Sequence, residues 1–108
     1  MTADAFKHQL AALSAEYRGE LPGKLDRVEN LWRDLTAGAV GPERLIDLVR
    51  ELHSIAGSAR TFGVAGVSEA AAAAESWLEP FTARHKLPAS PKQAEFARLL
   101  GELRRAAA

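Results

Sequence analysis

Histidine is the residue type with the widest chemistry in this chain, and one of the three histidines has an unusual setting. His8 and His85 lie among polar positions, and we expect both to be solvated. His53 falls at the edge of the apolar stripe of a predicted helix, where an imidazole is half packed and half exposed. Gly57 follows one turn later, although an interior glycine costs about 1 kcal/mol relative to alanine. We interpret the pair as a ring nitrogen beside a bare patch of helix that another protein can approach.

The residues around this pair are small or positively charged. Ser58 and Ala59 keep the region near Gly57 small. Arg50 lies one turn before the histidine and Arg60 about two turns after it, so both can supply positive charge to an anionic group or an acidic partner. We therefore predict His53 as the reactive residue, with docking and clearance provided by Gly57, Ser58, Ala56, Arg60 and Arg50.

The composition argues against several other chemistries. The absence of cysteine excludes disulfides, thiolate metal sites and cysteine nucleophiles, and it suits a reducing cytoplasm. With 14 basic and 14 acidic residues the formal net charge is zero, which gives no reason to expect nucleic acid or membrane as a partner. Glu69, Glu75 and Glu79 are spread along one predicted helix without a convergent histidine, so we predict no metal site. No secretory signal or membrane-spanning run is recognisable, and we predict a cytoplasmic protein.

Five helices are predicted to position these residues, because apolar residues recur at alternating steps of three and four. The first has its apolar face on Phe6, Leu10, Leu13 and Tyr17 and ends at Gly19, and the second opens near Pro22. The predicted ranges are about 4–17, 22–35, 42–62, 67–81 and 90–103, the third being the longest. Short connections favour antiparallel neighbours. We therefore predict an all-α fold, an antiparallel up-down four-helix bundle with an additional N-terminal helix.

The length of 108 residues predicts a single domain, residues 1–108, whose core is complete enough for a monomer. Trp32 and Trp77 are interpreted as core residues, and Arg104 and Arg105 as charges that favour a helix C-terminus. Met1 and the closing alanines suggest a free-standing chain, although an excised piece of a larger signalling protein would look the same.

The run LHSIAGSARTFG, residues 52–63, resembles the signature of histidine-containing phosphotransfer domains. Those domains show a histidine, a glycine four residues later, a small residue after it and a second glycine at the helix end. Further similarities lie upstream and downstream, at Leu21-Pro22, Leu25, Trp32, Val67-Ser68, Ala71 and Ala74-Glu75. The resemblance implies that His53 accepts and donates a phosphoryl group. The chain departs from the family at Ala56, where a lysine is frequent, and we assign the neutralising charge to Arg60 and Arg50.

The resemblance also implies partners and a role. The chain would relay a phosphoryl group between aspartate-bearing receiver domains in a two-component phosphorelay, working with response regulators and a hybrid histidine kinase. It would be a phosphocarrier intermediate rather than an autonomous enzyme, without an ATP-binding or kinase domain. No cofactor is expected in the chain, because the partner receiver supplies Mg²⁺.

A histidine on a helix bundle is also compatible with two other functions. A sensor-kinase dimerisation domain typically has an acidic residue after its histidine and a proline a few positions on, whereas this chain has Ser54 and no such proline. A non-phosphorylated helical adaptor, which would bind a receiver or kinase through the same face, stays open as an alternative.

Overall fold

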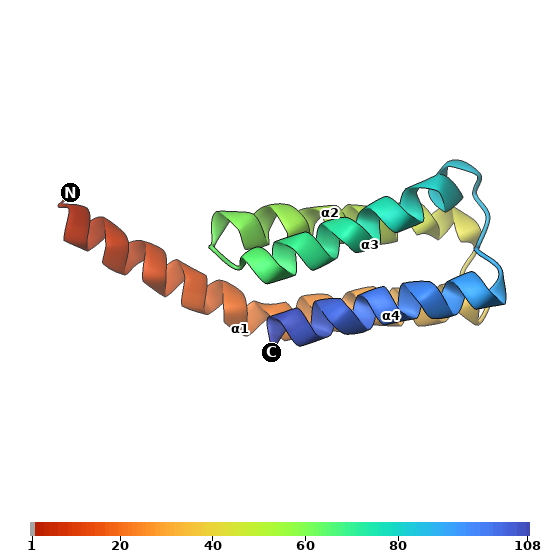
Figure 1. The fold of residues 1–108 in the computed structure, drawn as a ribbon, viewed down its shortest axis with the longest axis horizontal. Helices are drawn as coiled ribbons and strands as arrows, with labels where there is room; N and C mark the ends of the chain where they lie inside the picture. Colours follow the sequence, from red (N-terminus) through yellow and green to blue (C-terminus); the bar gives the residue numbers. More distant parts are fainter. Residues whose placement is uncertain (1) are drawn as a thin grey trace.

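The computed structural model describes residues 2–108, which fold into four α-helices and a short 3₁₀ turn. Helix α1 spans Ala3–Thr36, α2 spans Leu45–Thr61, α3 spans Ala65–Ala83 and α4 spans Ser90–Ala107, with the 3₁₀ turn η1 at Pro42–Arg44. Consecutive helices run in opposite directions and pack side by side (Figure 1). The predicted all-α, antiparallel four-helix bundle is confirmed.

The predicted break between the first two helices is wrong. Helix α1 runs without interruption through Gly19 and Pro22, so the additional N-terminal segment is the first half of α1, and α1 is the longest helix. The apolar stripe explains this continuity, because Tyr17, Leu21 and Leu25 follow one another in steps of four and stay on one face. Strong helix formers on both sides outweigh the local cost of the glycine and the proline.

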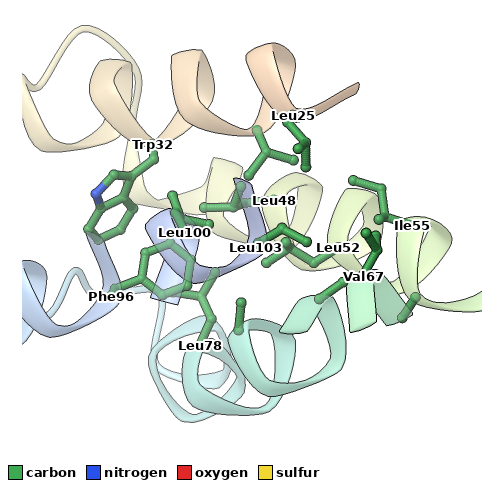
Figure 2. Packing of buried hydrophobic residues seen from close by; sticks show 14 of the residues in the cluster. Leu25, Trp32, Leu48, Leu52, Ile55, Val67, Leu78, Phe96, Leu100 and Leu103 are labelled. Atoms are coloured by element: carbon green, nitrogen blue, oxygen red, sulfur yellow. The ribbon is translucent and has the colours of Figure 1, made fainter. Parts of the chain in front are cut away.

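The core is a single apolar cluster to which all four helices contribute (Figure 2). Phe96 of α4 is fully buried and contacts the rings of Trp32 in α1 and Trp77 in α3, with centroids 4.5 and 5.3 Å away. Trp32 is therefore a core residue, as predicted, whereas Trp77 is partly buried and packs against the core. By contrast, Phe6, Leu10 and Leu13 are exposed, because the part of α1 that carries them extends beyond the bundle (Figure 1).

The tight connection between α2 and α3 fixes how these two helices face each other. Gly63 adopts a positive φ of 76°, which glycine tolerates without the steric cost of a Cβ atom. The backbone amide of Val64 then donates to the carbonyl of Ala59 at 2.8 Å, and that of Gly63 donates to Arg60 at 3.2 Å. This C-terminal cap reverses the chain within three residues, so that α3 returns directly along α2.

Candidate functional site

His53 lies in the middle of α2 and projects from the side of the bundle. Leu52 and Ile55, its near neighbours in sequence, are buried in the core. The imidazole itself is more accessible than the half-exposed ring expected from the sequence, since 77% of its side-chain surface is open to solvent. A reacting group on another protein can therefore reach it without any rearrangement of the bundle.

Glu75 of α3 anchors this exposed ring from one side. Its Oε2 atom lies 2.9 Å from Nδ1 of His53, and only 16% of the Glu75 side chain is exposed. An ionised carboxylate can only accept a hydrogen bond, so Nδ1 is assigned as the nitrogen that donates to Glu75. In a neutral ring with this tautomer the lone pair is on Nε2, the nitrogen that Glu75 does not contact.

The expectation that the glutamates of this helix lack a histidine partner is thus wrong for Glu75. Sequence reasoning noted Glu75 in the resemblance but gave it no role. A signal was available, because Val64 lies midway between residues 53 and 75. In an antiparallel helix pair joined at that point, these two residues come level with each other.

Gly57 forms an open surface beside the histidine. It is exposed, and a Cβ atom at this position would meet no atom of a neighbouring segment within 4 Å. Close packing between helices therefore does not account for a glycine here. One turn separates Gly57 from His53, so the bare backbone and the imidazole lie on the same strip of α2.

Two of the predicted docking residues have little surface to offer on that strip. Ala56 is only 6% exposed, and its carbonyl accepts a 2.7 Å hydrogen bond from Oγ of Ser68 in α3. Ser58 is half-buried and turned toward α1, where its Oγ lies 2.8 Å from the Tyr17 hydroxyl. Both short side chains are packed against the bundle and leave the strip beside Gly57 clear, and a docking role for them stays a prediction.

Arg50 and Arg60 are both exposed on α2 and can extend toward an anionic group. Arg60, seven residues after His53, also lines a shallow groove of about 320 Å³ between α2 and α3. The groove continues past Gly63 to Ser68 and Glu69, and it is bordered by small side chains. The surface around the histidine thus has few protruding side chains and carries two positive charges, on Arg50 and Arg60.

The remaining histidines do not form a comparable site. His8 and His85 are exposed, as predicted, and no hydrogen bond to a carboxylate is found for either ring among residues 2–108. Within the same residues there is no cluster of three side chains suited to hold a metal ion. None of the helices described combines the length and the apolar character that crossing a bilayer requires.

The bundle thus presents on its flank an exposed histidine that is anchored by a carboxylate and open to another protein. The family model described as the Hpt domain matches residues 12–108 of this chain. The chain therefore belongs to the Hpt domain family, whose members carry out histidine phosphotransfer in two-component signalling with receiver domains and histidine kinases. No curated protein and no solved structure matches the chain.

Proposed function

We propose that this chain is a phosphorelay carrier that takes a phosphoryl group onto Nε2 of His53 and passes it between aspartate-bearing receiver domains. The observation that carries the proposal is the exposed imidazole held through Nδ1 by Glu75 at 2.9 Å. This contact orients the ring and leaves Nε2 free, which is what an in-line attack on phosphorus requires.

In the forward step the Nε2 lone pair forms a bond to phosphorus while the bond from phosphorus to the aspartyl oxygen breaks. The electron pair of that bond returns to the aspartate as a carboxylate. The ring, which now carries the phosphoryl group and keeps its Nδ1 proton, becomes cationic. The Glu75 carboxylate offsets this charge, and the reverse step regenerates the neutral imidazole.

The rest of the machinery belongs to the partner in this proposal. A receiver supplies Mg²⁺, and the bare strip at Gly57 lets its active-site edge approach the ring. Arg60 and Arg50 supply the positive charge that a lysine at position 56 supplies in many relatives. The absence of cysteine is consistent with a cytoplasmic setting for this exchange.

The test is incubation with a panel of phosphorylated receiver domains, followed by mapping of the labelled residue. We expect label on His53 only, stable in alkali and lost in mild acid, as for a phosphoramidate. His53→Gln should abolish uptake with unchanged helicity by circular dichroism, whereas His85→Gln should leave it intact. Label that persists in the His53→Gln variant would contradict the assignment. Receiver binding without any labelling would favour the adaptor.

A further inference from the structure

The N-terminal part of α1 carries an apolar stripe that no other part of the described chain covers. We call residues 3–16 the arm. It precedes Tyr17, the first buried residue of α1, and extends roughly 21 Å beyond it at about 1.5 Å per residue (Figure 1). On the arm, Phe6 is 57% exposed, Leu10 40% and Leu13 45%. A helix of about 14 residues is marginal in water by itself, so this one gains stability when its stripe is covered.

The spacing of the stripe identifies the kind of surface that fits it. Ala3, Phe6, Leu10, Leu13 and Tyr17 alternate in steps of three and four, which is the narrow seam of a two-stranded coiled coil. We propose that the arm pairs antiparallel with the arm of a second copy of this chain, with the two Leu10 side chains at the two-fold axis. This proposal replaces the monomer expected from the sequence.

The bundle itself selects the antiparallel direction. At Tyr17 the stripe passes under α2, because the Tyr17 ring stacks on Phe62 with centroids 5.1 Å apart. A parallel partner helix would continue along the stripe into the space that α2 and α3 occupy. An antiparallel partner ends with its own residue 3 near Tyr17, so the uncovered length of stripe matches the length of the arm that covers it.

A groove at the base of the arm supports the same pairing. It measures about 190 Å³ and is lined by Leu13, Glu16, Tyr17, Glu20 and Phe62. With the axis at Leu10, Phe6 of the second copy comes level with Ser14, one residue from Leu13, which lines this groove. Because the interface is isologous, both Phe6 rings are covered at once.

Pairing of the arms leaves phosphotransfer unobstructed. His53 is nine residues from Phe62, roughly 14 Å along α2 at the usual helical rise. The proposal is therefore independent of the role proposed for His53, and the two can fail separately.

The first test is sedimentation velocity of the full chain over a concentration series. A single pair of short helices predicts a weak dimer, so the mass should rise from one chain to two as concentration increases. Leu10→Lys places two like charges at the axis and should keep the mass at one chain throughout. Ala12→Lys, on the opposite face of the arm, should dimerise like the parent. Phosphoryl uptake by Leu10→Lys should be unchanged.

The second test uses the absence of cysteine in the chain. Under mild oxidation Leu10→Cys should form a disulfide-linked dimer, and a mixture of Phe6→Cys with Leu13→Cys should cross-link. Phe6→Cys alone should not, since that product requires parallel arms, and Ala12→Cys is the control on the opposite face. A chain that stays monomeric, with Leu10→Cys no faster to cross-link than Ala12→Cys, overturns the proposal. Hydrogen exchange would then separate an arm folded onto its own bundle, with protected amides, from an unpaired arm.

Discussion

His53, the proposed phosphoryl acceptor, is positioned by one contact rather than by a pocket. His53 has most of its surface in solvent, and its ring orientation is set by the 2.9 Å contact with Glu75. The Glu75 carboxylate can hold the ring in place because the Glu75 side chain is itself largely buried, with only 16% of its surface exposed. A hydrogen bond to a charged acceptor is roughly twice as strong as a neutral one, so this contact can hold the ring in one tautomer.

Removal of the Glu75 charge should slow transfer without removing the acceptor. We expect Glu75→Gln to lower the rate of phosphoryl uptake about tenfold, since the amide oxygen still accepts a hydrogen bond but does not offset the cationic product. Glu79→Gln, one turn further along α3 and exposed, is the matched control. Nitrogen NMR of the His53 ring should show a weaker preference for the Nδ1 proton in Glu75→Ala. Rates equal to the parent in both glutamate variants would contradict the role of Glu75.

Substitutions at Gly57 should separate stability from function. Because a Cβ atom there meets open space, Gly57→Ala should raise the free energy of unfolding by about 0.5–1 kcal/mol in urea titrations. Gly57→Leu should reduce transfer from a receiver more than tenfold, since its side chain occupies the strip on which the partner docks. Ala73→Leu adds an exposed leucine on α3 as the control. Normal transfer by Gly57→Leu would mean that receivers approach His53 from another side.

Relations between residues within one helix could be predicted from the sequence, whereas relations between residues of two neighbouring helices could not, because they depend on how the helices align along each other. His53 and Gly57 lie one turn apart in a single helix, so their relation can be derived from the sequence alone. Glu75 belongs to another helix, and three glutamates of that helix had an equal claim until the turn at Gly63 fixed which one lies opposite His53. The packing of Ala56 and Ser58 could not be derived from the sequence for a related reason, because the positions of α1 and α3 around α2 decide which faces of α2 are covered.

The helix boundary at Gly19 was predicted because glycine and proline often end helices. Helix α1 nevertheless continues, because the apolar residues before and after Gly19 lie on the same face. Gly19 and Pro22 nevertheless weaken α1 locally. Proline has no amide hydrogen to donate to the carbonyl of Arg18, and glycine adds backbone freedom in the unfolded state. The first packed turns of α1, just after the arm, therefore contain two residues that disfavour the helix.

Replacement of Gly19 should strengthen this part of α1. A Cβ atom at Gly19 would meet no atom within 4 Å, so Gly19→Ala should favour the helix by about 1 kcal/mol. Amides of residues 15–19 should then exchange with solvent about fivefold more slowly, whereas those of α4 should be unchanged. Unaltered exchange near residue 19 would show that the arm opens at another point.

At the scale of the whole molecule, an ion network ties the last helix to the first. Nη2 of Arg104 lies 2.6 Å from Glu29 and 2.7 Å from Asp26, two residues of α1. The interpretation of Arg104 as a simple helix-end charge is therefore incomplete. Hydrogen bonds to Glu29 and Asp26 raise the pKa of the Arg104 guanidinium further above its usual range. A raised pKa favours the charged form in the folded state, so this contribution is present throughout the neutral range.

Loss of this network should destabilise the bundle modestly. We expect Arg104→Met to lower the free energy of unfolding by about 1 kcal/mol, because the pairs are partly exposed but involve two carboxylates. The melting temperature should fall by about 4–8 °C. Arg105→Met should have little effect, and the difference between the two variants should shrink in high salt. Equal melting temperatures in low salt would show that the network adds nothing.

The openness of the His53 ring has a consequence for how long a stored signal lasts. Because the domain does not enclose the His53 ring, it cannot shield a phosphoryl group on that ring from bulk water between one receiver encounter and the next. If His53 carries the phosphoryl group as proposed, the half-life of the phosphorylated protein is then governed by the intrinsic hydrolysis of the nitrogen–phosphorus bond. Any sheltering, and any acceleration of discharge, begins only when a receiver closes over the helix.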